Sequence, residues 1–217
     1  MIHLSQVIQT IPPGVGLVAV SKYKPASLIQ EAYAQGQRVF GESRALELRD
    51  KYEGLPKDIE WHFIGHLQRN KVKYIAPFVS LIHAVDSFSL LEEIDRQAAR
   101  FGRVIPCLLE LHVAQEETKS GFTPSECIAL VAEGKWKNLR HVELAGLMCM
   151  ATYTDNQDQI AAEFDTALQT FQLLKSRFFA STPTFRHRSW GMSGDYLIAL
   201  QHGATLVRIG TAIFGER

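Results

Sequence analysis

Cysteine is scarce in this chain and shows no organised spacing. Only Cys107, Cys127 and Cys149 occur, and no two of them form a Cys-x-x-Cys pair. The odd number does not suggest a disulfide framework, and the spacing does not suggest a zinc site. Cys107 and Cys149 lie in apolar runs, so we expect buried thiols that pack as small hydrophobic side chains.

An excess of charge of either sign is also missing. The 23 basic and 23 acidic residues balance to zero, whereas a nucleic-acid-binding domain is normally basic. No apolar run reaches the roughly 18 residues that a membrane helix needs. Residues 1–16 lack the basic and apolar segments of a signal peptide. We therefore expect no nucleic-acid or membrane partner and a cytoplasmic location.

What the chain does contain is a regular alternation of short apolar runs with longer amphipathic stretches. The segments expected to form strands are residues 16–22, 38–42, 60–65, 80–85, 104–113, 142–150, 186–191 and 205–214, of which 186–191 is polar. The stretches expected to form helices are residues 25–35, 45–52, 69–75, the segment from Ser87 to 101, and 124–133, 157–178 and 193–201. Ser87, Thr123 and Ser193 are expected N-caps, and Gly36 is expected to end the first of these helices.

Eight strands separated by helices predict a parallel sheet with crossover helices. The strand count favours a closed, single-domain (β/α)₈ TIM barrel over residues 1–217, with an open doubly wound sheet as the alternative. In such a barrel the active site lies at the carboxyl ends of the strands. We therefore searched these ends for groups that carry chemistry.

Lys22 closes the first buried strand. Burial disfavours the charged form of an amine, and the neutral amine is the nucleophile that Schiff-base chemistry requires. A lysine that extends past the strand end into solvent is the alternative interpretation.

The loops after the seventh and eighth strands have the composition of a phosphate site. Ser193 and Gly194 follow the seventh strand, and Gly210 and Thr211 interrupt the run assigned to the eighth. Hydroxyl and backbone N–H groups in these two loops recur as phosphate sites in barrels of this kind.

Arg208 lies inside the apolar run of the eighth strand, and a buried arginine keeps its charge and needs a partner. Two partners are open: a carboxylate such as Glu110, or a heteroatom of a ligand. His62, His83 and Met148 lie on other strands, where ligand contact and ordinary core packing are both open. The histidines form no recognisable metal set.

With these residues assembled, the chain resembles the pyridoxal phosphate homeostasis protein family over essentially its whole length. The matching segments are AVSKYK (19–24), FGES (40–43), WHFIGHLQRNK (61–71), HAVDS (83–87), TKSGF (118–122), GLMCMAT (146–152) and residues 190–217. The family often has asparagine where Ser43 stands, and serine, which can also donate a hydrogen bond, is shorter.

The resemblance implies a fold-type III barrel, as in the alanine racemase N-terminal domain, that binds pyridoxal 5′-phosphate (PLP). Lys22 would form the Schiff base, and Ser193, Gly194, Gly210 and Thr211 would hold the phosphate. Arg208 would lie near the pyridine nitrogen or the phosphate side, with Ser43, Met148, His62 and His83 near the ring.

Three functions are compatible with these residues. The first is a PLP carrier without robust turnover that supplies PLP-dependent apoenzymes and influences amino- and keto-acid balance. A chain of this length has no room for the second domain that provides the second base of a racemase, which favours this function and a monomer. The second is a small PLP-dependent racemase or lyase. The third is an aldolase-type barrel that forms its Schiff base with a sugar phosphate.

Overall fold

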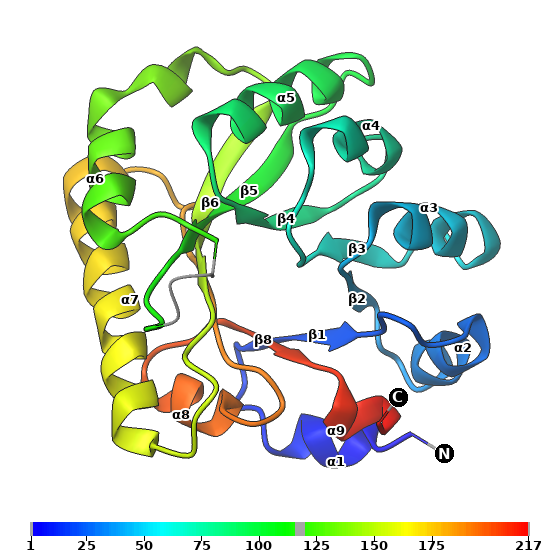
Figure 1. The fold of residues 1–217 in the computed structure, drawn as a ribbon. Coiled ribbons are helices and arrows are strands. Elements are labelled where there is room, and N and C mark those ends of the chain that lie inside the picture. The colour runs from blue at the N-terminus through cyan, green and yellow to red at the C-terminus, as the bar shows by residue number, and fades with distance from the viewer. Residues whose placement is uncertain (1, 116–119, 217) are drawn as a thin grey trace.

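The chain forms a closed barrel of eight parallel strands surrounded by helices (Figure 1). The structure is a computed structural model that describes residues 2–115 and 120–216. The strands are β1 (Gly16–Val20), β2 (Val39–Glu42), β3 (Glu60–Phe63), β4 (Leu81–Val85), β5 (Ile105–Leu111), β6 (Val142–Cys149), β7 (His187–Ser189) and β8 (Leu206–Ile209). Each strand pairs with its neighbours in chain order, and β1 pairs with β8 to close the barrel. The predicted barrel is confirmed.

The helices lie outside the strands. They are α1 (Leu4–Gln9), α2 (Ala26–Ala34), α3 (Ala45–Gly54), η1 (Arg69–Lys71), α4 (Val72–Ile75), α5 (Phe88–Ala99), α6 (Pro124–Glu133), η2 (Lys135–Asn138), α7 (Gln157–Phe178), α8 (Tyr196–Gln201) and α9 (Thr211–Phe214). In the described part of the chain, no helix is long and apolar enough to cross a membrane.

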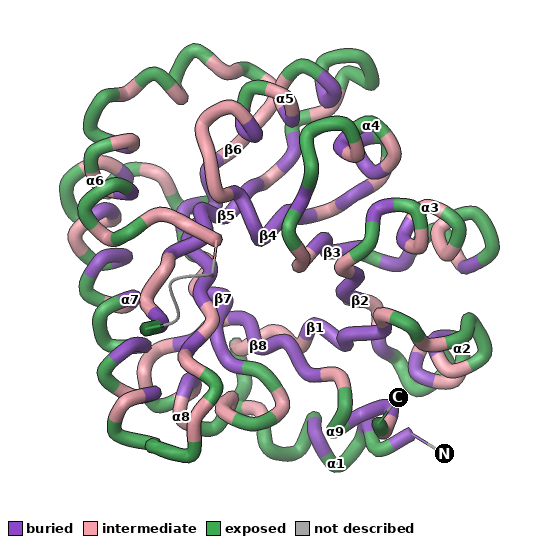
Figure 2. Tube along the Cα trace, in the orientation of Figure 1, coloured by how far each residue is buried: buried purple, intermediate pink, exposed green. Residues whose placement is uncertain are grey.

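Alternation along each strand produces two separate cores. The larger one lies between strands and helices and includes Phe40, Trp61 and Val207. The smaller one includes Leu81, Leu108, Ala145, Met148 and Leu206, whose strand positions alternate with residues of the larger core. Figure 2 shows the buried strands around the centre and the exposed faces of the helices at the periphery.

Gly146 lets two strands of the barrel approach closely. A Cβ at this position would lie 1.9 Å from the carbonyl oxygen of His187 on β7, and the φ angle of Gly146 is +148°. The register between β5 and β6 also shifts beside this residue. Only glycine fits this point, because any side chain would collide with the backbone of the neighbouring strand.

Two of the expected helix boundaries are confirmed. Thr123 caps α6 with a complete capping box, in which its side chain and that of Glu126 each accept from the other residue's backbone N–H. Gly36 has a φ angle of +98° directly after α2, as a C-terminal glycine does. Ser87 occupies the N-cap position of α5 but makes no capping hydrogen bond.

Three boundaries differ from the prediction. The eighth strand ends at Ile209 rather than at residue 214, because residues 211–214 form α9. The predicted helix 193–201 begins only at Tyr196, with Asp195 at the N-cap position. The N-terminal helix α1 was not predicted; it packs beside α9, where the His3 N–H donates to the Ile213 carbonyl at 2.8 Å (Figure 1).

The three cysteines are free and buried, and burial raises the pKa of each thiol. This confirms the expected burial of Cys107 and Cys149, and Cys127 is buried as well. Thr118 and Lys119 of the TKSGF segment lie outside the described residues.

Candidate functional site

Lys22 lies in the turn that follows β1, two residues beyond the end of the strand, so the strand boundary predicted at Lys22 was wrong. The β1–β2 pairing extends as far as Ser21, whose N–H donates to the Gly41 carbonyl at 3.0 Å. Lys22 itself is half-buried, and its amine has no hydrogen bond or ion pair with any residue that the structure describes. The mouth of the barrel therefore presents a primary amine that forms no hydrogen bond or ion pair with another described residue.

The turn carrying Lys22 is conformationally strained. Tyr23 has a φ angle of +63°, in the left-handed region where a non-glycine residue costs about 1–3 kcal/mol. The turn closes through the Lys24 N–H, which donates to the Ser21 carbonyl at 3.0 Å. The Lys24 amine donates to the carbonyls of Gly215 and Glu216 at 2.9 and 2.7 Å. Lys24 is thus engaged structurally, in contrast to Lys22.

Arg208 lies inside the barrel on β8, with 4% of its surface exposed. Its Nη1 donates to the carbonyl and the Oγ of Ser189 at 2.6 and 2.7 Å, and its Nη2 donates to the Cys149 carbonyl at 2.9 Å. The suggested pairing with a carboxylate such as Glu110 was wrong, because oxygens of β6 and β7 accept from the guanidinium instead. These bonds use three of the five N–H donors of an arginine.

A chain of hydrogen bonds leads from Arg208 across the barrel to β3. Ser189 Oγ lies 2.8 Å from His83 Nδ1, and His83 Nε2 lies 3.0 Å from His62 Nδ1. Burial lowers the pKa of His62 to about 3 and that of His83 well below its ordinary value, with a smaller contribution from neighbouring charges such as Arg208. Both rings are therefore neutral at neutral pH.

The donors and acceptors in this series of hydrogen bonds can be assigned by starting from Arg208. Arg208 can only donate, so Ser189 Oγ accepts from it and uses its own proton toward His83 Nδ1. His83 then carries its proton on Nε2 and donates to His62 Nδ1, which leaves the His62 proton on Nε2. This tautomer assignment gives every donor between Arg208 and His62 an acceptor.

Ser189 was not among the expected site residues, although it links Arg208 to His83 and is fully buried. The available signal was its position on the one polar strand, two residues from His187, where alternation directs a side chain to the barrel interior. Met148 lies at 0% exposure in the inner core, on β6 opposite Ser189 of β7.

The loops after β7 and β8 come together as expected. The Gly210 N–H donates to Ser193 Oγ at 3.2 Å, so Ser193 links the two loops and does not cap α8 as predicted. A Cβ at Gly210 would lie 3.1 Å from the Val20 carbonyl, which brings this loop against the end of β1. Gly194 and Thr211 lie exposed beside the link.

Four backbone N–H groups in these loops have no acceptor among the described residues. They belong to Ser193, Gly194, Thr211 and Ala212. Amides that converge without a partner at adjacent loops provide donors for an anion such as phosphate.

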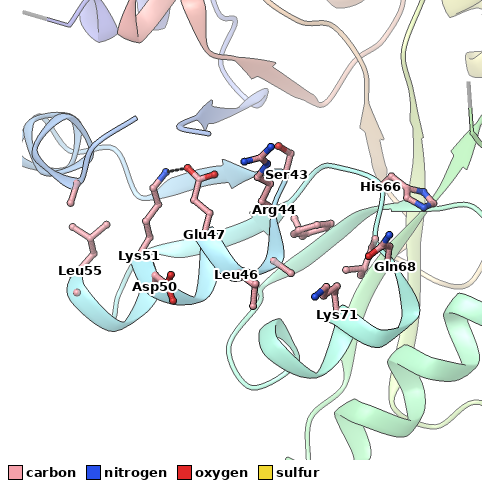
Figure 3. A pocket seen from close by; sticks show the side chains of 15 residues that line it. Ser43, Arg44, Leu46, Glu47, Asp50, Lys51, Leu55, His66, Gln68 and Lys71 are labelled. Atoms are coloured by element: carbon pink, nitrogen blue, oxygen red, sulfur yellow. Dashed lines mark hydrogen bonds and ion pairs between the residues drawn. The ribbon is translucent and has the colours of Figure 1, made fainter. Parts of the chain in front are cut away.

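A cavity of about 840 Å³ opens at the side of the barrel mouth, between α3 and η1 (Figure 3). Ser43 lines this cavity together with Arg44, His66 and Lys71. Ser43 thus lines a cavity beside the barrel mouth, and none of the other expected site residues lines that cavity.

Comparison with known proteins defines first a class and then a family. The sequence model described as "Alanine racemase, N-terminal domain" matches residues 3–217. A "Pyridoxal phosphate homeostasis protein" of Aquifex aeolicus is 40% identical over 202 residues, which cover 93% of this chain and 86% of that protein. The chain belongs to the pyridoxal phosphate homeostasis protein family.

Solved structures agree with this assignment. PipY of Synechococcus elongatus PCC7942 without PLP superposes with a TM-score of 0.90 at 36% identity, covering 98% of both chains. The structure of PipY with PLP bound superposes with a TM-score of 0.86 at 35% identity and the same coverage.

The buried histidines predict a pH dependence of stability. Because the pKa of His62 is lower in the folded than in the unfolded chain, the unfolded chain takes up protons first below pH 6.5. Stability is therefore complete above that pH and is lost as the pH falls toward 3. We expect His62→Gln to remove about 2 kcal/mol of the decrease in the free energy of unfolding between pH 8 and pH 5.

Urea unfolding of the PLP-free protein and the variant at several pH values measures this difference. Equal slopes of stability against pH in the two proteins would show that His62 titrates normally in the folded state.

Proposed function

We propose that this chain binds PLP as a Schiff base on Lys22 and acts as an intracellular buffer and donor of PLP without robust turnover. The observation that carries the proposal is that, among the described residues, the amine of Lys22 and four backbone N–H groups of the loops after β7 and β8 have no partner. β1 and β8 are hydrogen-bonded neighbours, so the turn of Lys22 and the loop of Gly210 begin from adjacent strand ends.

The phosphate fits the loops after β7 and β8. The N–H groups of Ser193, Gly194, Thr211 and Ala212 would donate to its oxygens, and the Ser193–Gly210 hydrogen bond would hold the two loops at a fixed separation. No basic side chain needs to move, because backbone amides bind phosphate well when they converge.

The ring of PLP would lie at the mouth of the barrel, near Arg208 and Met148. Arg208 uses three of its N–H donors in bonds to Ser189 and Cys149, and its remaining two would face the ring. A guanidinium stays protonated, so Arg208 would not pass a proton to the pyridine nitrogen. Bound PLP supplies an electron sink and an exchangeable imine linkage. A ring nitrogen without a proton weakens the first property and keeps the second, which suits a carrier.

The histidines of the barrel wall support a role without turnover. A general base works best with a pKa near the working pH, whereas burial holds the pKa of His62 at about 3. His62 and His83 are also engaged with each other and with Ser189. Neither is suited to remove a proton from an amino acid at neutral pH. The contact of Ser43 with PLP remains a prediction, since Ser43 lines the side cavity.

PLP-dependent apoenzymes are the recipients that this role requires. The name of the Aquifex aeolicus relative and the PLP-bound structure of PipY support the same cofactor, and the name of the relative supports the homeostasis role.

The phosphate assignment predicts a selective effect of Ser193→Ala. Loss of the hydroxyl removes the hydrogen bond that links Ser193 to Gly210 and holds the two loops together, so we expect the affinity for PLP to fall about fivefold, as for one neutral hydrogen bond of about 1 kcal/mol. The affinity for pyridoxal, which lacks the phosphate, should stay unchanged. Ser176→Ala, an exposed serine of α7, is the matched control. Equal losses for both ligands in absorbance titrations would refute the phosphate role.

The carrier role predicts transfer without turnover. We expect the PLP-loaded protein, freed of excess PLP, to reactivate an apo-aminotransferase, and Lys22→Ala prepared in the same way to transfer far less. Chiral chromatography should detect no conversion of L-alanine to D-alanine by the loaded protein. Sustained racemisation that depends on Lys22 would identify an enzyme and contradict the carrier role.

A further inference from the structure

Three charged residues outside the barrel contact both residues that flank Lys22. Glu42 closes β2. Glu47 and Lys51 lie one turn apart on α3 (Figure 3). We call these three residues the α3 clamp. None of them was expected from the sequence to take part in the site.

Lys51 is the centre of the clamp. Its amine donates to the Ser21 carbonyl at 2.8 Å, to Glu42 Oε1 at 2.8 Å and to Glu47 Oε1 at 2.7 Å. An ammonium has three N–H donors, so this set is complete. The side chain of Lys51 is only 11% exposed and that of Glu42 is 0% exposed, which places the ion pairs where solvent screens them little.

The two carboxylates extend the clamp to either side of Lys22. Ser21 Oγ donates to Glu42 Oε1 at 2.6 Å, and the Tyr23 N–H donates to Glu47 Oε1 at 2.7 Å. The Tyr23 ring lies under the guanidinium of Arg44, at 4.7 Å from its centroid. Ser21 and Tyr23 are therefore both held toward α3.

The direction of Lys22 follows from its neighbours. Ser21 continues the β1–β2 ladder with its side chain toward α3, and side chains alternate between the two faces of a strand. The residue after Ser21 thus starts on the face toward the barrel interior. Tyr23 then requires a left-handed backbone, a conformation that persists only where the surroundings hold it. The hydrogen bond from Tyr23 to Glu47 supplies that hold.

We infer that Glu42, Glu47 and Lys51 are positioning residues that hold the turn of Lys22 so that its amine meets PLP in the barrel mouth. This inference rests on the proposed function, because it assigns the clamp to the covalent step at Lys22. The clamp acts through Ser21 and the backbone of Tyr23, and Glu47 and Lys51 also line the side cavity that contains Ser43.

Glu47 offers the sharpest test, because its charge and its acceptor role can be separated. Glu47→Ala removes the acceptor of the Tyr23 N–H, whereas Glu47→Gln removes the charge and keeps an acceptor oxygen. Glu53→Ala is the control, since Glu53 is an exposed carboxylate of the same helix. We expect Glu47→Ala to lower the affinity for PLP about tenfold, as for one charge-assisted hydrogen bond, and Glu47→Gln to keep most of it.

Whether Glu47→Ala lowers the affinity for PLP only when Lys22 is present distinguishes positioning of Lys22 from general destabilisation. In a Lys22→Ala background the remaining affinity is non-covalent, so adding Glu47→Ala should not change it. Equal losses with and without Lys22, or equal losses in Glu47→Ala and Glu47→Gln, would overturn the inference. Circular dichroism and thermal unfolding establish that each variant is folded.

A second arm works without PLP. In the PLP-free protein, hydrogen–deuterium exchange of a peptide covering residues 21–24 should be faster in Glu47→Ala than in Glu53→Ala or the unmodified chain. Unchanged exchange would overturn the clamp. If PLP does not attach to Lys22 at all, the proposed function fails, and the exchange result still decides whether the clamp holds the turn.

Discussion

The charge of Arg208 inside the barrel is the constraint on which the rest of the interior depends. A guanidinium cannot be neutralised by burial as a histidine can, so the strands around it must supply acceptors. Cys149 and Ser189 supply them. Ser189 is also hydrogen-bonded to His83, which in turn is hydrogen-bonded to His62. The interior is consequently apolar around Leu81, Leu108 and Leu206 and polar along this chain. An apolar residue at 208 would leave several buried polar groups unpaired.

The mouth of the barrel is assembled from elements that are separate in the sequence. The loops after β7 and β8 are linked by the Ser193–Gly210 hydrogen bond, and Gly210 packs against the end of β1. On the other side, α3 holds the turn that follows β1. Lys22 therefore lies between a region of unpaired amides and a set of ion pairs. The turn that carries the unengaged amine of Lys22 therefore starts from a strand next to the one that leads into the Gly210 loop.

Much of this could be predicted from the sequence, and the failures have physical causes. Buried strands mostly appear as apolar runs, and the polar seventh strand was recognised from its place in the alternation with helices, so all eight were found. The run of residues 205–214 was extended too far, because a short apolar run does not distinguish a strand from a buried helix such as α9. Lys22 and Arg208 could be selected because charged residues are unusual in buried strands, and Ser193 and Gly210 because they lie in the two loops where such barrels bind phosphate. The roles of Ser189 and Lys51 depend on contacts between distant segments (Ser189 with His83, Lys51 with Ser21), and no local pattern reports them.

The most direct test of the account is to locate covalently bound PLP. The purified protein, supplied with PLP and freed of the excess, is reduced with borohydride and mapped by mass spectrometry of its peptides. The account predicts a visible absorbance that reduction abolishes, and the added mass of a reduced pyridoxyl phosphate group on Lys22. Attachment to Lys24, or a protein that stays colourless in the presence of PLP, would contradict it.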